Sequence, residues 1–186
     1  MRLFIAINLP PDVRRGIWDA AEPLRSASYP VKWVDADGIH LTLKFLGEVE
    51  DPREPEIVAG MQAAAAGARQ FRVPISGFGG FPSSENPRVV WVGCEGVPPL
   101  EILQHRMEQE MERLGFPLEG RAFRPHVTLG RAAREARAAD FTGAGEMLAN
   151  LAFEHDVMVE SVDLMESRLT PRGARYQRRH AAALPS

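Results

Sequence analysis

The sequence predicts a fold that mixes strands and helices in two similar halves, with a cleft between them. Three observations support this prediction. Segments with the alternation of strands and segments with the spacing of helices follow one another in an order that one unit used twice would give. A short motif of His, apolar, Thr, apolar occurs at residues 40–43 and again at residues 126–129, 86 positions further on. The length of 186 residues suits a single domain, or two small lobes that share a cleft.

Composition and charge exclude several classes of protein. Apolar residues make up 45% of the chain and charged residues 25%, values typical of a globular domain. The net charge of −3 disfavours a duplex-DNA binder, because such domains are strongly basic. Cys94 is the only cysteine, so an internal disulfide is impossible. No apolar run approaches the roughly 20 residues that span a bilayer, and the first residues lack a signal-peptide core. We therefore expect a cytoplasmic protein without a membrane partner.

The first half of the chain is predicted to contain two strands and two helices. Residues 3–9 are apolar on both alternating faces, as in a fully buried strand. Two prolines then begin a helix. Proline is tolerated there because the N–H that it lacks would have no hydrogen-bond partner in the first turn. Tyr29-Pro30 ends this helix. A second strand is expected at residues 39–46, and an alanine-rich helix at residues 54–68.

The second half is predicted to repeat this alternation with additional strands. Turn-rich residues separate its first two strands, and Gly115 is a natural cap for the helix that follows. The predicted elements are, in chain order, strands at 71–78 and 88–92, a helix at 98–114, a strand at 123–130, a short helix at 146–151, and strands at 153–167 and 174–180.

Each copy of the motif places one imidazole and one hydroxyl on the same strand face. Side chains two residues apart on a strand point the same way, so His40 shares a face with Thr42, and His126 shares a face with Thr128. If the two halves pack about a twofold axis, two histidines and two threonines meet in one cleft.

The same alternation assigns faces to the neighbouring residues. Leu41, Leu43 and Phe45 are predicted to fill the core side of the first motif strand. Lys44 is predicted on the polar face with the first histidine, and Arg124 has the parity of the second histidine.

Paired imidazoles suit acid–base chemistry at phosphorus. Histidine titrates near neutral pH, so a neutral imidazole can deprotonate water while a charged one protonates a leaving oxygen on the opposite side of the phosphorus atom. Threonine hydroxyls can donate to the non-bridging phosphate oxygens, and the guanidinium of Arg131, just after the second motif, can clamp a phosphate. A strained cyclic phosphate needs no powerful Lewis acid to expel a sugar oxygen, so we expect no metal.

Other interpretations remain open on the residues alone. The five histidines lack the spacing of a zinc site, although a nearby carboxylate could complete a mixed one. The same pair of histidines could act on a small cyclic nucleotide, such as a nucleotide 1″,2″-cyclic phosphate. The chain could also bind RNA ends without turnover, or be a purely structural duplicated domain.

The ordered set of motifs extends over essentially the whole chain. Its pieces are Arg2–Ile7, Lys32–Val34, His40–Glu48, Gly79–Pro82, Pro87–Gly93, Phe123–Arg131, Glu166–Leu169 and Gly173–Tyr176. On these residues the chain resembles the two-histidine phosphoesterase superfamily, and within it the RNA 2′,3′-cyclic phosphodiesterases, also called 2′-5′ RNA ligases (the LigT/ThpR type). Departures from the family pattern are Asn8 in place of a common acid, Met165 in place of a common aromatic residue, and Gly130 in place of a frequent alanine.

The resemblance implies an α+β fold that is bilobal and duplicated about a pseudo-twofold axis. Two antiparallel sheets face a central cleft, with helices packed outside, in a single domain that spans residues 1–186. The implied partner is an RNA end that bears a 2′,3′-cyclic phosphate, and we expect a cytoplasmic monomer with no cofactor.

The resemblance also implies the reaction and the roles of the site residues. The cyclic phosphate is hydrolysed to a 2′-phosphomonoester without metal, with reversible 2′-5′ RNA ligation as a second activity. His40 is the proton donor to the leaving 3′ oxygen, and His126 is the proton acceptor that activates water. Thr42 and Thr128 hold the phosphate, and Arg131 is a further candidate for phosphate binding.

Overall fold

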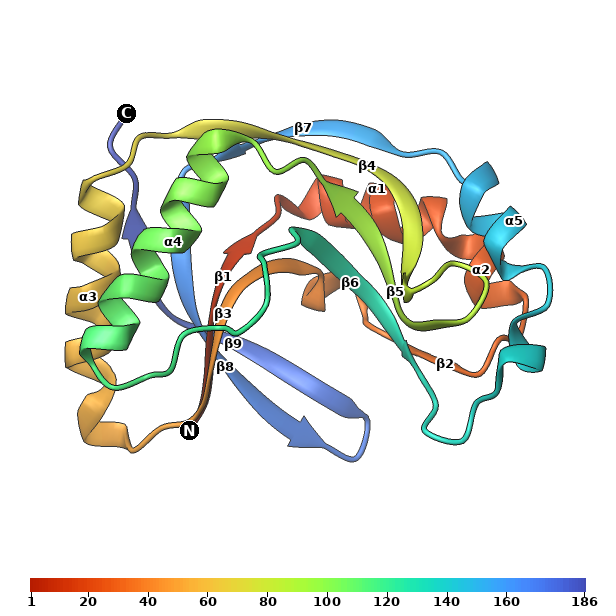
Figure 1. Cartoon of the computed structure of the whole chain (residues 1–186), viewed down its shortest axis with the longest axis horizontal. Coiled ribbons are helices and arrows are strands. Elements are labelled where there is room, and N and C mark those ends of the chain that lie inside the picture. The colour runs from red at the N-terminus through yellow and green to blue at the C-terminus, as the bar shows by residue number, and fades with distance from the viewer.

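Nine antiparallel strands form one strongly curled sheet in the computed structural model, which describes all 186 residues (Figure 1). Eight strands follow the order β7-β4-β5-β6-β3-β1-β8-β9, and the short strand β2 pairs with β6. The strands are β1 (Arg2–Asn8), β2 (Val31–Trp33), β3 (His40–Glu48), β4 (Phe71–Pro82), β5 (Pro87–Cys94), β6 (His126–Ala132), β7 (Glu154–Val159), β8 (Ser161–Thr170) and β9 (Gly173–Ala183).

The sheet consists of two matching halves that meet at the motif strands. One half has the order β3-β1-β8-β9 and the other has the order β6-β5-β4-β7. The only residue pair that joins β3 to β6 is Leu41 with Val127. Apart from this single pair, the two halves form separate sheets. The predicted α+β fold with duplicated halves is confirmed.

Each half of the sheet contains strands from the other half of the chain, β4 and β5 on one side and β8 and β9 on the other. β4 follows the first motif in sequence, yet it pairs with β5 and β7. β8 follows the second motif, yet it pairs with β1. The two motif strands occupy equivalent places as a result, each at the inner edge of its half.

Helices cover the outside of the sheet in two groups (Figure 1). α3 and α4 pack against each other behind one half, where α3 contacts β8 and β9 and α4 contacts β3. α1, α2 and α5 gather at the other end, where α5 contacts β4. The bounds are α1 (Pro11–Ala20), α2 (Glu22–Ser26), α3 (Glu54–Ala66), α4 (Pro98–Arg113) and α5 (Ala144–Asn150), with short 3₁₀ turns at Ala36–Gly38, Asp51–Arg53 and Ala138–Phe141.

A single apolar core of 36 buried residues lies between the helices and the sheet. The strand β1 supplies residues to both of its sides, because Leu3, Ile5 and Ile7 enter this core while Phe4 and Ala6 form a small cluster on the opposite face. The prediction of a strand buried on both faces is therefore confirmed. No helix has the combination of length and apolar character that crossing a membrane requires.

Several predicted elements differ from those observed, and β4 and β6 end later than predicted. The single strand expected at 153–167 is two strands, β7 and β8, which separate at the exposed Glu160 and enter different halves of the sheet. The first helix is divided into α1 and α2 at Ala21, because Pro23 cannot continue the hydrogen bonds of a helix. The short strand β2 was not predicted, and β9 is longer than its predicted range.

Candidate active site

The two motif strands bring all five predicted site residues to one cavity of about 360 Å³. His40 and Thr42 line it from β3, and His126, Thr128 and Arg131 line it from β6. The convergence that strand alternation and duplication predicted is therefore present in the structure.

Both imidazoles are held in the same orientation by backbone carbonyls. Nδ1 of His40 lies 2.7 Å from the carbonyl oxygen of Gly38, and Nδ1 of His126 lies 2.7 Å from the carbonyl oxygen of Arg124. A carbonyl oxygen can only accept, so Nδ1 carries a proton in each ring. Nε2 is then the atom that gains or loses a proton, a base when the ring is neutral and an acid when it is charged.

Aromatic rings fix the two imidazoles from the side. The His40 ring centroid lies 4.9 Å from that of Phe4 and 5.1 Å from that of Tyr176, whose ring meets it edge-on. The His126 ring meets Phe81 edge-on, with the centroids 5.1 Å apart. Burial lowers the pKa of His40 below its ordinary value, and the hydrogen bond to Gly38 acts in the opposite direction.

A bulge in each motif strand changes which side chains face the cavity. Thr42 pairs with Ala6 while Lys44 pairs with Ile5, so Leu43 is the extra residue of the first strand. Lys44 consequently points into the core, where it is 2% exposed, and Phe45 lines the cavity with 57% of its surface exposed. The predicted faces of these two side chains were wrong, because the simple alternation does not survive a bulge.

The second motif strand carries an equivalent bulge at Leu129. Thr128 pairs with Trp91 and Gly130 pairs with Val90, which leaves the leucine unpaired between them. Arg131 therefore lines the cavity as Phe45 does, although its parity alone would have placed it on the opposite face. Arg124, which has the parity of the second histidine, lies before β6 and lines neither this cavity nor the two that adjoin it.

The departure at Gly130 has a packing explanation. A Cβ atom at this position would lie 2.6 Å from Val31 Cγ1 and 2.7 Å from Trp33 Cε3, both on β2. Only glycine lets β2 pair this closely with β6. This close approach brings Trp33 beside the site, where it lines an adjoining cavity with Arg131.

Several other aromatic side chains lie at or near the site. Phe4 is 2% exposed, contacts the first histidine and lines the cavity from its buried side, and Trp91 packs against Phe81. Tyr176 lines the cavity. Phe45 also lines it, which strand alternation did not predict because of the bulge.

The single thiol and the positions of the possible metal-ligating side chains are as follows. Burial raises the pKa of the Cys94 thiol to about 12, so this group is protonated at neutral pH. No three His, Cys, Asp or Glu side chains are grouped as a metal site would require.

Comparisons with known proteins agree with this geometry. A family model described as the 2′-5′ RNA ligase superfamily matches residues 11–170. A protein of Thermotoga maritima named RNA 2′,3′-cyclic phosphodiesterase is 31% identical over 178 residues, which are 95% of this chain and 92% of that protein. A protein of the same name from Methanothermobacter thermautotrophicus is 32% identical over 179 residues, which are 95% of each chain.

Solved structures are similar over nearly the whole chain. The crystal structure of E. coli LigT complexed with 3′-AMP has a TM-score of 0.79 and 27% sequence identity, with 100% of this chain and 98% of that chain covered. The crystal structure of a Thermus thermophilus protein has a TM-score of 0.82 and 30% identity, with 99% and 98% covered.

Proposed function

Since the chain belongs to the 2′-5′ RNA ligase superfamily, we propose that it hydrolyses the 2′,3′-cyclic phosphate at an RNA end to a 2′-phosphomonoester, with His40 and His126 as its acid and base. Cyclic phosphodiesterase activity on RNA is the activity in the names of its curated relatives. The division of roles between the histidines follows the family resemblance.

The proposed step is an in-line displacement at phosphorus. Nε2 of neutral His126 takes a proton from water as the water oxygen attacks the phosphorus atom. The bond between phosphorus and the 3′ oxygen breaks, and Nε2 of charged His40 gives its proton to that oxygen. The phosphate stays on the 2′ oxygen, one water is consumed, and exchange of protons with solvent restores both imidazoles.

Hydroxyl and guanidinium groups stabilise the charge that develops on phosphate. Thr42 and Thr128 donate to the two non-bridging oxygens from opposite strands, and Arg131 adds a charge-assisted contact. With an RNA 5′-hydroxyl in place of water, the same displacement would form a 2′-5′ linkage.

The observation that carries this proposal is the matched orientation of the two imidazoles. Each Nδ1 donates to a carbonyl, and both rings line the same cavity as the two threonines. Burial lowers the pKa of His40 in the free protein, which disfavours the charged acid. A bound phosphodiester anion opposes this effect, because a negative charge nearby favours the imidazolium.

The experiment is to incubate a short RNA ending in 2′,3′-cyclic phosphate with the protein in the presence of EDTA and identify the product isomer. We expect a 2′-phosphate. A 3′-phosphate would mean that the 2′ oxygen leaves and would overturn the assigned displacement. Activity that disappears with EDTA and returns with a divalent metal would overturn metal independence.

A further inference from the structure

The cleft continues into a second cavity of about 320 Å³ between β2 and the tip of the β8–β9 hairpin. The two cavities share Arg131, Tyr176, Val34 and Gly38, so they are parts of one depression. In Figure 1 the β8–β9 hairpin projects downward beyond the rest of the sheet, and the strands β2 and β6 lie to its right. We call the surface formed by Lys32, Trp33, Arg131, Leu169, Arg172 and Arg175 the basic groove.

The basic groove concentrates positive charge on a chain whose net charge is −3. This cavity is lined by four basic side chains, from Lys32, Arg131, Arg172 and Arg175, and by only two carboxylates, from Asp35 and Asp37. The single ion pair among them, between Arg175 and Asp35, is 4.0 Å long and exposed, so solvent and salt screen it. The other three cations are free to meet an anionic ligand.

Apolar surface lies beside these cations. Trp33 lines the groove from β2, and Leu169 near the hairpin tip is 77% exposed. Trp33 is half-buried, whereas the leucine is exposed. Cations next to accessible aromatic and apolar side chains are typical of single-stranded RNA sites, because the cations contact phosphates and the flat bases stack.

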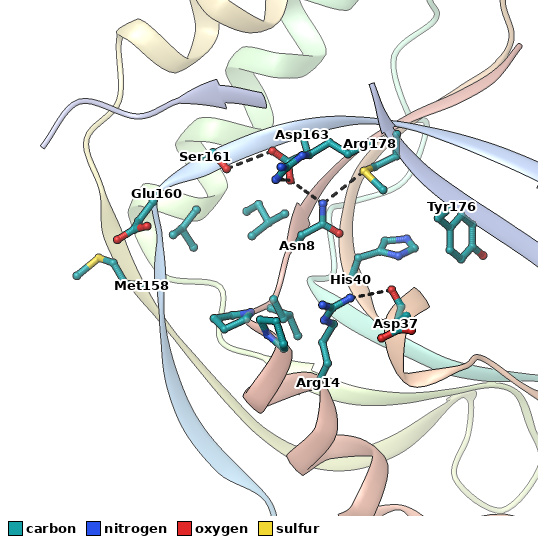
Figure 2. Close-up of a pocket in the computed structure, with 16 residues that line it drawn as sticks. Asn8, Arg14, Asp37, His40, Met158, Glu160, Ser161, Asp163, Tyr176 and Arg178 are labelled. Atoms are coloured by element: carbon teal, nitrogen blue, oxygen red, sulfur yellow. Dashed lines mark hydrogen bonds and ion pairs between the residues drawn. The ribbon is translucent and has the colours of Figure 1, made fainter. Parts of the chain in front are cut away.

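The opposite continuation of the cleft has a different character (Figure 2). This cavity of about 470 Å³ shares His40 and Tyr176 with the cleft. Its lining contains two arginines, Arg14 and Arg178, and the three carboxylates of Asp37, Glu160 and Asp163. A phosphate entering here would meet an excess of negative charge.

Several side chains that line this second cavity contact one another. Asp163, which is 2% exposed, accepts hydrogen bonds from Asn8 at 2.6 Å and from Ser161 at 3.1 Å, and it lies 3.8 Å from Arg178. Arg14 donates through Nη1 to the carbonyl oxygen of Asp37 at 2.8 Å, while its Nε is buried without a hydrogen-bond partner. The side-chain amide of Asn8, the family departure, therefore holds a buried carboxylate rather than offering its N–H groups to a ligand (Figure 2).

We propose that the RNA strand preceding the terminal nucleotide leaves the cleft through the basic groove, which binds at least one of its internal phosphodiesters. The enzyme then prefers an oligonucleotide cyclic phosphate to a mononucleotide one. This inference rests on the proposed function, because it assigns the path of the same substrate.

The test compares two substrates and a matched pair of arginines. The substrates are a nucleoside 2′,3′-cyclic monophosphate and a tetranucleotide with the same terminal nucleotide. Arg175 lines the groove and Arg178 lines the opposite cavity, yet both lie on β9, both side chains are 61% exposed, and each lies about 4 Å from one carboxylate. The partner of Arg175 is the exposed Asp35 and that of Arg178 is the buried Asp163, so urea unfolding first verifies that Arg178→Ser is folded under the assay conditions. The variants are Arg172→Ser, Arg175→Ser and Lys32→Ser, with Arg178→Ser as the control.

We expect each groove variant to lower kcat/KM for the tetranucleotide by about tenfold, the effect of one lost charge-assisted contact. Turnover of the mononucleotide should be unchanged. Arg178→Ser should leave the ratio of kcat/KM for the tetranucleotide to kcat/KM for the mononucleotide as in the wild type. Equal losses of kcat/KM on both substrates, or a lowered ratio in Arg178→Ser alone, would overturn the proposed path.

A binding measurement keeps this inference separate from the activity. The probe is a fluorescent tetranucleotide that ends in a 2′-phosphate, followed by anisotropy at several salt concentrations. The groove variants should weaken its binding and reduce the dependence of log Kd on log salt, whereas Arg178→Ser should not. Absence of hydrolysis by the wild type would overturn the proposed function, and unchanged binding in all groove variants would overturn the groove.

Discussion

The Lys44 ammonium lies 2.9 Å from the Glu108 carboxylate, and both side chains are buried. Lys44 also donates to the carbonyl oxygen of Pro117 at 2.8 Å, and the same carboxylate accepts from the backbone N–H of Glu119 at 3.2 Å. The pair thus ties the first motif strand to α4 and to the segment that leads into the second motif. It is a structural link between the two parts of the site.

Replacing one member of this pair should lower the free energy of unfolding far more than replacing both. Lys44→Met leaves a buried carboxylate without its counter-charge, so we expect a loss of about 3–5 kcal/mol in the free energy of unfolding. The double variant Lys44→Met/Glu108→Met should recover most of that loss, because apolar pairs can substitute for buried ion pairs. Urea unfolding measures both.

The exposed pair of Arg113 and Glu110 provides the control for this comparison. Arg113→Ala should change the free energy of unfolding by less than about 1 kcal/mol. A Lys44→Met variant as stable as Arg113→Ala would show that the buried pair has no special importance.

Removal of either cleft histidine should abolish most of the turnover while leaving the fold intact. We expect His40→Ala and His126→Ala each to lower kcat on the cyclic-phosphate RNA by roughly 10²–10⁴-fold, the usual contribution of an acid or base. His105→Ala, which changes an exposed histidine on α4, should behave as the wild type. Near-normal turnover in either cleft variant would contradict the mechanism.

Burial of His40 should make folding stability depend on pH. The pKa of this imidazole is lowered in the folded state from its ordinary value of 6.5. As the pH falls from above 6.5 toward the lowered pKa, only the unfolded chain takes up a proton at this site, so stability decreases. His40→Gln removes this contribution, and its unfolding free energy should decline less between pH 7 and pH 5. A parallel decline in both proteins would refute the prediction.

The Cys94 thiol should be slow to react in the folded protein. With a pKa of about 12, its thiolate fraction at pH 8 is on the order of one in 10⁴. We expect alkylation by iodoacetamide to accelerate greatly in urea, as followed by mass spectrometry. Cys94→Ser should retain cyclic phosphodiesterase activity, and its inactivity would require a role for the thiol.

Sequence reasoning located the site better than it located the individual side chains. The repeated motif placed His40 and His126 correctly in one cleft, because strand alternation holds within three residues. It failed at Lys44 and Phe45, since the bulge at Leu43 comes from pairing with β1 and leaves no local signal. The carbonyls that orient the imidazoles were equally hidden, because every residue carries one.

The single strand predicted at 153–167 was also wrong because of long-range packing. Residues 153–167 have the composition of one strand, and only the packing of two separate halves divides them at Glu160. The order of the periodic segments already predicted two similar halves, and the resemblance to a family added two antiparallel sheets facing the cleft. The three-residue strand β2 is too short for any pattern, yet it brings Trp33 to the basic groove.

The exchange of strands between the halves means that neither half of the chain is a self-sufficient folding unit. A backbone cut within Ser83–Asn86, the connection between β4 and β5, would give one fragment with His40 and another with His126. Each fragment would hold strands that the other needs, since β4 completes the second half of the sheet, and β8 and β9 complete the first. Each fragment therefore needs the other to complete its sheet, and the two cleft histidines come together only in the reassembled complex.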